Sequence, residues 1–157
     1  MPGAPFSSPG RGDADSADTD RMELQLSMVV LEVRDLEASV RFYRALGLEI
    51  ADPPGGRPLV IHRMPSGVSL LLTTGFASVY DPSWSRPAGG YQQLLEFYVG
   101  DDSIVESKWR ELTDAGYHGR MPPTATAGPF AAMVDDPDGN VVLLTSDAAA
   151  SPEPRES

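Results

Sequence analysis

The chain has 157 residues and no cysteine, and its formal net charge at pH 7 is −11. The length suits one ordinary domain with a buried core, and the lack of cysteine excludes disulfides, thiolate metal sites and a cysteine nucleophile. The negative charge argues against a nucleic-acid partner, because phosphate binding needs clustered Lys and Arg. It favours a neutral or cationic partner, and solubility alone is the other explanation.

Both ends of the chain have the composition of disordered tails. Residues 1–20 are rich in Gly, Pro, Ser and Asp and have few apolar side chains to bury, and residues 147–157 are similar. No apolar run approaches the roughly 18 residues of a membrane span, and the N-terminus lacks the apolar segment of a signal peptide. We therefore expect a cytoplasmic protein that does not bind a membrane, with one domain at residues 21–146.

An internal repeat divides this domain into two halves. Residues 29–35 and 95–101 are both strand-like runs that end in Val-x-Asp, and their final aspartates lie 66 residues apart. Each aspartate is a candidate N-cap, because its side chain can accept a hydrogen bond from a backbone N–H in the first turn of a helix. A helix is therefore predicted after each strand, over about 36–46 and 102–115.

A second pair of matching segments follows the helices. Residues 64–73 and 136–145 each place an x-Pro-[Ser/Asp]-Gly turn between two apolar runs, which is the pattern of a hairpin. Each half therefore reads as a strand, a helix and two or three further strands, the first over 24–75 and the second over 91–146. The linker between them, residues 76–90, is long for a segment without structure, and such loops tend to be functional or mobile.

These segments resemble the vicinal oxygen chelate superfamily, which comprises glyoxalases, bleomycin-resistance proteins and extradiol dioxygenases. The resemblance covers residues 22–146 and rests on three segments in order: residues 28–50, the strand and helix from Glu96 onward, and Phe130 to Thr145 with its Asp-Pro-Asp-Gly-Asn turn. It implies an α+β fold in which two βαβββ units form an open, curled mixed sheet with helices outside. It also implies a homodimer, since small members with two units commonly pair.

Enzymes of this superfamily bind a divalent metal through four side chains, usually His, Glu or Gln. Counting from the helix-capping aspartates and the turn glycines places these positions at Met28, Leu71, Leu94 and Leu143. All four are apolar, whereas divalent ions need carboxylate oxygen or imidazole nitrogen. A shift of one residue would add only Gln93. We therefore predict no metal, no cofactor and no catalytic residue.

The cavity side of each strand follows from the alternation of side chains along a strand. Residues with the parity of the four apolar positions should face the cavity, and the opposite parity is more uniformly apolar and suits the core under the helices. An apolar floor with a few polar groups is typical of small-molecule sites. The predicted ligand-binding residues are Met28, Val30, Leu71, Thr73, Trp84, Gln92, Leu94, Glu96, Tyr98 and Leu143.

Glu96 and Trp84 are the most informative of these residues. A carboxylate in a half-enclosed apolar groove is costly unless it is paired or near water. Two explanations for Glu96 are equally open. A cationic ligand would pair with it, or Glu96 lies at the water-filled mouth of the groove or pairs with an arginine of the chain. Trp84, in the linker, either offers rigid contact area to a planar ligand or packs the linker onto its own domain or a dimer mate.

Three functions fit these residues. The first is a metal-free protein similar to the bleomycin-resistance branch. It would bind a drug or natural product that is neutral or cationic, a planar compound being one option, and would confer antibiotic resistance by sequestering it. The second is a glyoxalase- or dioxygenase-like enzyme (a lyase, isomerase or oxygenase) with a non-standard or absent metal site, in which Glu96 is a base and Tyr98 an acid. The third is a protein interaction module without a small ligand. The missing metal ligands favour the first.

Overall fold

The computed structural model describes residues 23–146 of the chain, and both halves begin with the predicted strand and helix. Strand β1 (Met28–Glu32) leads into helix α2 (Leu36–Leu46). Strand β4 (Leu94–Tyr98) leads into helix α4 (Asp102–Asp114). The internal repeat of the sequence is therefore a repeat of structure.

Aspartates cap both helices, as the repeat predicted. The Asp35 carboxylate accepts a hydrogen bond from the backbone N–H of Ala38 at 3.2 Å, and the Asp101 carboxylate accepts one from that of Ser103 at 2.9 Å. These bonds satisfy N–H groups that lack a partner inside the helix. The Ser103 N–H, together with the Ser103 hydroxyl, also holds the pKa of Asp101 below its ordinary value. Gly47 ends α2 with a φ of 125°, a conformation that favours glycine.

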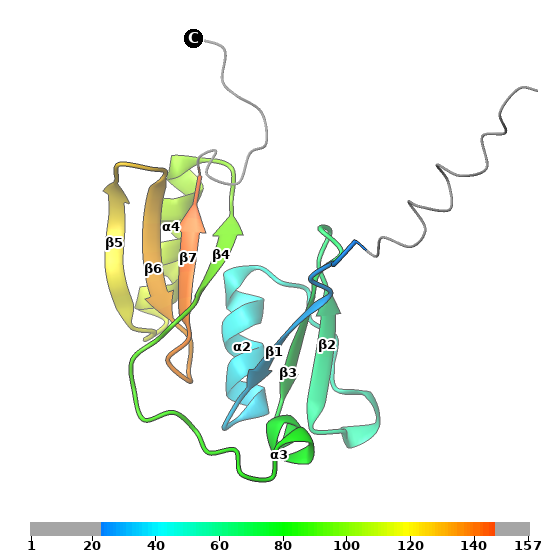
Figure 1. The fold of residues 1–157 in the computed structure, drawn as a ribbon. Coiled ribbons are helices and arrows are strands. Elements are labelled where there is room, and N and C mark those ends of the chain that lie inside the picture. The colour runs from blue at the N-terminus through cyan, green and yellow to red at the C-terminus, as the bar shows by residue number, and fades with distance from the viewer. Residues whose placement is uncertain (1–22, 147–157) are drawn as a thin grey trace, which may run out of the picture.

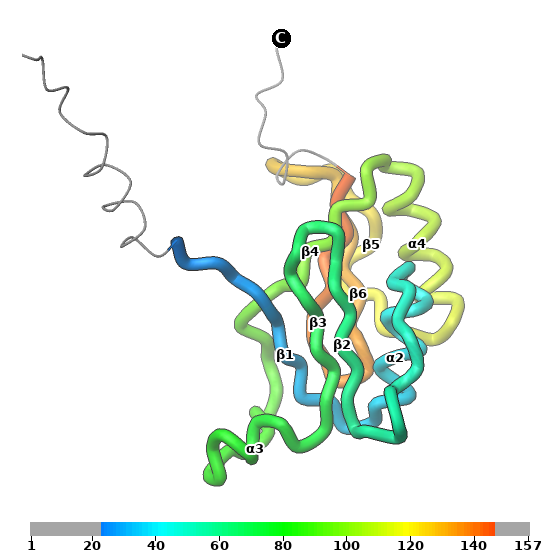
Figure 2. Tube along the Cα trace, turned by 90° about the vertical axis from the view of Figure 1, so that its right-hand side faces the viewer, coloured from blue at the N-terminus to red at the C-terminus, as the bar shows by residue number. Residues whose placement is uncertain are grey.

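The strands form two mixed sheets, one in each half (Figures 1 and 2). In the first, β3 (Ser69–Thr73) lies between β1, to which it is parallel, and β2 (Leu59–Arg63), to which it is antiparallel. In the second, the order is β4-β7-β6-β5, and β4 is parallel to β7 (Val141–Thr145). Strands β6 (Phe130–Asp135) and β5 (Gly119–Ala125) continue it with antiparallel pairs.

This architecture confirms the predicted α+β fold, with open sheets and helices outside. The second half is a complete βαβββ unit, whereas the first half has two strands after its helix. A short 3-10 turn, η1 (Pro54–Gly56), occupies the stretch between α2 and β2. Pro53, Pro54 and Pro58 lack the N–H that a strand contributes to a sheet, which explains why this stretch adds no further strand. The linker contains one short helix, α3 (Phe76–Tyr80).

One hydrophobic core lies between the sheets and helices α2 and α4, which cover the same side of the sheets (Figure 2). The alternation of the sequence predicted which strand residues enter it. They include Leu31, Val33, Leu70, Leu72, Val142 and Leu144. Trp109 of α4 packs against this core. Within residues 23–146, no helix has the length and apolar character that crossing a membrane requires.

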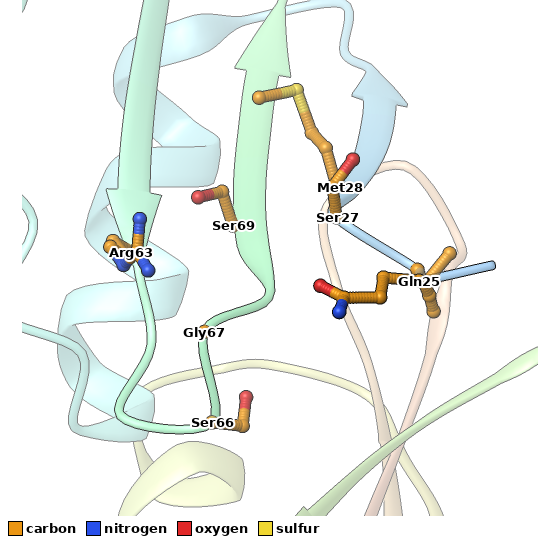
Figure 3. A pocket seen from close by; sticks show the side chains of 8 residues that line it. Gln25, Ser27, Met28, Arg63, Ser66, Gly67 and Ser69 are labelled. Atoms are coloured by element: carbon orange, nitrogen blue, oxygen red, sulfur yellow. The ribbon is translucent and has the colours of Figure 1, made fainter. Parts of the chain in front are cut away.

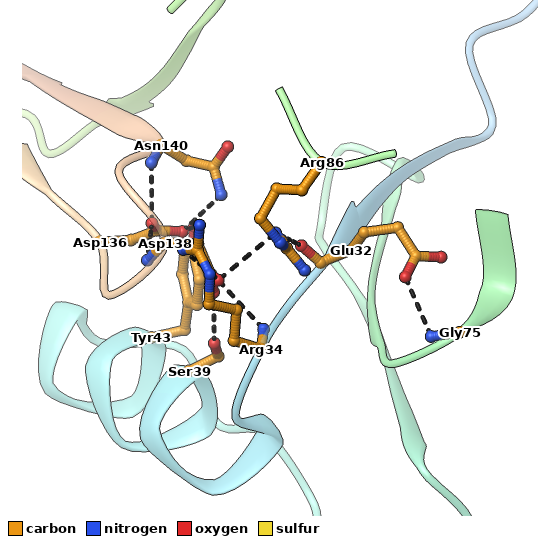
Figure 4. A network of polar contacts seen from close by, with 9 residues as sticks. All are labelled: Glu32, Arg34, Ser39, Tyr43, Gly75, Arg86, Asp136, Asp138 and Asn140. Atoms are coloured by element: carbon orange, nitrogen blue, oxygen red, sulfur yellow. Dashed lines mark hydrogen bonds and ion pairs between the residues drawn. The ribbon is translucent and has the colours of Figure 1, made fainter. Parts of the chain in front are cut away.

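A buried hydrogen bond joins helix α2 to the turn between β6 and β7, residues 136–140 (Figure 4). The hydroxyl of the fully buried Tyr43 donates to Asp136 Oδ2 at 2.7 Å. Asp136 is 4% exposed and also accepts from the backbone N–H groups of Asp138 and Asn140 and from the Asn140 side chain. Burial, and then the charge and hydrogen bond of Asp136, raise the pKa of Tyr43 far above its ordinary value. The phenol therefore stays protonated as a donor.

Replacing Tyr43 with Phe should lower the free energy of unfolding by about 1–3 kcal/mol, because the change takes a donor from a buried carboxylate. Urea denaturation measures the loss. Tyr117→Phe is the matched control, since the Tyr117 ring also packs edge-on against Phe42, while its hydroxyl bonds to no group in residues 23–146. Equal losses in the two variants would contradict the role assigned to this bond.

Candidate functional site

A groove of about 1260 Å³ opens where β1, the linker and the turn between β6 and β7 meet. We call it the linker groove, because residues 76–90 form one of its walls. Four aromatic rings line it: Phe76, Tyr80, Trp84 and Tyr91. The Phe76 and Tyr80 rings lie 4.9 Å apart between centroids. Concave sites with several aromatic rings and a few polar groups are typical of small-molecule binding.

Three of the predicted ligand-binding residues line the linker groove. Val30 comes from β1 and is 37% exposed, Trp84 comes from the linker and is half-buried, and Gln92 precedes β4. The predicted alternatives for Trp84, ligand contact and packing of the linker, are compatible here, because its ring lines the groove and stacks with the Arg86 guanidinium at 5.5 Å.

The other seven predicted residues lie outside the linker groove, on the strands. Three of them are buried or half-buried, three on β4 are exposed, and one lines a second pocket. The buried or half-buried residues are Leu71, Thr73 and Leu143, the exposed residues are Leu94, Glu96 and Tyr98, and Met28 lines the second pocket. Glu96 is exposed on β4 and makes no hydrogen bond or ion pair with residues 23–146; its contact with a ligand stays a prediction.

Glu32 fastens the linker to the first sheet. Its carboxylate accepts hydrogen bonds from the backbone N–H of Gly75, at 3.0 Å, and from that of Ala77. Both amides lie at the start of α3, where N–H groups have no partner within the helix. The alternation of the sequence placed Glu32 on the cavity face without indicating this role.

Two arginines that the sequence did not single out also line the groove (Figure 4). Arg34 follows β1 and Arg86 lies in the linker, and both form ion pairs with Asp138 of the turn between β6 and β7. Arg86 Nη1 also donates to the backbone oxygen of Glu32 at 3.0 Å. The linker is thus bonded to β1 through Glu32 and to the second half through Asp138, which fixes one wall of the groove.

A second, open pocket of about 810 Å³ lies between the start of β1 and the turn between β2 and β3 (Figure 3). Its lining includes Met28, Arg63, Ser66 and Ser69. It has no aromatic ring among its lining residues, and Met28 is the only predicted ligand-binding residue in it. We therefore place the candidate site in the linker groove.

The residues at the four metal positions do not fit a divalent metal. Leu71 pairs with Val30, and Leu143 pairs with Glu96, across the parallel strands. If the metal positions on β1 and β4 lay two residues later, they would fall on Val30 and Glu96. Only the Glu96 carboxylate could then coordinate a metal. Nor does any group of three or more His, Cys, Asp or Glu side chains in residues 23–146 lie where it could hold a metal ion.

The chain belongs to the Glyoxalase/Bleomycin resistance protein/Dioxygenase superfamily, which matches residues 25–144. This match confirms the resemblance read from the three sequence segments. No curated protein matches the chain.

Several solved structures share the fold of this chain. The hypothetical protein SA1046 from S. aureus is 22% identical with a TM-score of 0.70, over 83% of this chain and 98% of its own. TnmS3, an antibiotic-binding protein from Streptomyces sp. CB03234, is 25% identical with a TM-score of 0.57, over 80% and 98%. Lactoylglutathione lyase from Agrobacterium tumefaciens is 24% identical with a TM-score of 0.57, over 80% and 95%. Binding proteins and enzymes are therefore both among the neighbours.

The first prediction from this site concerns metal content. Protein purified without chelators and then dialysed should hold well under 0.1 equivalent of Zn²⁺, Ni²⁺, Mn²⁺ or Fe²⁺ per chain, on the order of what nonspecific surface sites retain, because leucines supply no ligand atoms. Elemental analysis by mass spectrometry measures it. One tightly held ion per chain would show that the chain binds metal elsewhere.

The second concerns the linker. Glu32→Ala should speed hydrogen exchange at the Gly75 and Ala77 amides by about fivefold, the equivalent of about 1 kcal/mol for a partly exposed bond to a carboxylate. Exchange followed by NMR measures the rates. Glu96→Ala removes the same side chain from an exposed site on β4 and should leave both amides unchanged; an effect of similar size there would contradict the fastening role.

Proposed function

We propose that this protein binds a drug or natural product in the linker groove, without a metal and without converting it. The observation that carries the proposal is the set of four apolar side chains at the positions where enzymes of the family hold their metal. Binding of this kind withholds the compound from its target by mass action. We propose that this sequestration takes place in the cytoplasm and confers resistance to the compound.

The lining of the groove supports a planar ligand. Four aromatic rings line it and offer flat contact area, and rigid aromatic side chains lose little conformational entropy when they bind. The structural likeness to TnmS3, which is described as an antibiotic-binding protein, agrees with this choice.

The enzymatic alternative has less support in the structure. Glu96 and Tyr98, the pair considered as base and acid, are both exposed on β4 and line neither the linker groove nor the second pocket. General acid–base pairs usually depend on burial that shifts their pKa values. The likeness to lactoylglutathione lyase concerns the fold.

Ligand binding should change the fluorescence of one of the two tryptophans. Titration with bleomycin and with a panel of planar aromatic antibiotics should quench Trp84, which lines the groove, while mass spectrometry finds the compound unchanged. Trp84→Phe should abolish the quenching, and Trp109→Phe, which alters the core-packed tryptophan, should preserve it. Release of a modified compound with turnover would overturn the proposal in favour of the enzyme.

We also propose that two copies pair through the open faces of their sheets. Val30, Ile61, Leu94 and Tyr98 are apolar or aromatic side chains that are 37% to 56% exposed on strands β1, β2 and β4. Exposed apolar groups that cluster on one face are typical of interaction surfaces.

The dimer is tested by sedimentation velocity on a matched pair of variants. Leu94→Glu should raise the dissociation constant of the dimer at least about tenfold, because it replaces an apolar contact with a second carboxylate beside Glu96 on the pairing face, and burying carboxylates there is costly. Ile104→Glu, at a residue of α4 with nearly the same exposure (42% against 43%), should leave it within about twofold. A wild-type chain that sediments as a monomer at 100 μM would overturn the pairing.

A further inference from the structure

Two guanidinium groups converge on one shielded carboxylate in the lining of the linker groove. The Nη1 atoms of Arg34 and Arg86 lie 3.4 Å and 3.6 Å from Asp138 Oδ1. The Asp138 side chain is 4% exposed, whereas those of Arg34 and Arg86 are 60% and 28% exposed and both line the groove. Two positive charges therefore meet one negative charge, and the positive charges are on the solvent side.

Most donors of these two arginines remain available to a ligand. A guanidinium carries five N–H donors, and within residues 23–146 only the Nη1 atoms of Arg34 and Arg86 have polar partners. The Asp138 carboxylate, by contrast, is well supplied: it also accepts from the backbone N–H of Arg34 at 3.0 Å and from the Ser39 hydroxyl at 3.4 Å. Asp138 thus orients the two guanidinium groups without neutralising both.

The other charged groups of the groove are already engaged. The Glu32 carboxylate points away from Arg86, toward the amides at the start of α3 (Figure 4). Arg120 donates through Nε and Nη2 to the two carboxylate oxygens of Asp135, at 2.7 Å and 2.8 Å. Of the arginines that line the groove, Arg34 and Arg86 are therefore the two without a bidentate carboxylate partner among residues 23–146.

We propose that Arg34 and Arg86 bind an anionic group of the ligand, a carboxylate or a phosphate, which makes the ligand an aromatic acid. This inference rests on the proposed binding function and adds the charge of the ligand to it. Guanidinium forks match the geometry of both anions. The Trp84 ring, stacked 5.5 Å from the Arg86 guanidinium, places a flat apolar surface beside the charged end. The expectation of a neutral or cationic ligand reflected the net charge and Glu96, which lies outside the groove.

Calorimetric titration with probes of one shape and different charge tests the inference. The probes are 2-naphthoate and 2-naphthyl phosphate as anions, 2-naphthamide as the neutral analogue, and 2-(aminomethyl)naphthalene as the cation. At least one anion should bind at least about tenfold more tightly than the amide, the usual advantage of a charge-assisted fork over a neutral hydrogen bond. The two anions distinguish a carboxylate ligand from a phosphate ligand.

Matched substitutions locate the effect in the groove. Arg86→Gln should remove most of the preference for the anion, and Arg86→Lys should retain part of it, because lysine keeps the charge and loses the fork. Arg41→Gln removes the same charge from an exposed position on α2 outside the groove and should leave the preference within about twofold. Circular dichroism at the titration temperature confirms that each variant is folded.

The outcomes separate this inference from the function on which it rests. Equal affinity for the anions and the amide, or tighter binding of the cation, would overturn the anion site and leave small-molecule binding intact. A preference that Arg41→Gln reduces as much as Arg86→Gln would also overturn it, since the effect would then be one of overall charge. Binding of no probe up to about 1 mM, where only about −4 kcal/mol is needed, would overturn both proposals for planar ligands in this groove.

Discussion

The buried aspartates of the turn between β6 and β7 hold the two halves of the molecule together. Asp136 accepts a hydrogen bond from the hydroxyl of Tyr43 in the first half. Asp138 accepts hydrogen bonds from Arg34 and Ser39 and forms an ion pair with Arg86. Each carboxylate is almost wholly shielded from water, and a buried charge is tolerated only when it is paired and hydrogen-bonded. The position of one half relative to the other is therefore set by polar contacts as well as by the shared apolar core.

The linker groove is a consequence of the same contacts. One wall comes from the first half, one from the second, and the third is the linker, which Arg86 ties to Asp138 and Glu32 ties to β1. A change in the turn would therefore reshape the groove without touching its aromatic rings. The structural neighbours include an antibiotic-binding protein and an enzyme, and in this chain the four positions predicted for metal ligands hold apolar side chains.

The sequence predicted the features that depend on local rules. Helix caps at Asp35 and Asp101, turns before Gly67 and Gly139, and the alternation that buries Leu31 and Leu72 all act over a few residues. The missing strand in the first half was foreseeable in part, because prolines before β2 disfavour a ladder.

The polar groups of the groove could not be predicted in the same way. Arg34 and Asp138 lie 104 residues apart in the chain, and no periodic pattern connects them. Glu96 seemed to be the charged group of the site because it shares its parity with the cavity face, yet parity says nothing about how the linker crosses that face. The linker lies over the end of β1, which leaves β4 exposed.

The two arginines of the groove and the net charge of the chain would act on an anion at two length scales. An anion that comes within about one Debye length of the surface, roughly 8 Å at physiological ionic strength, meets the repulsion of a chain with a net charge of −11; at the proposed site it would meet two guanidinium groups. Such a protein would capture anionic ligands more slowly than a basic one of equal affinity and would release them correspondingly slowly. The charges of the chain would thus influence how long an anionic ligand stays bound as well as how tightly it binds.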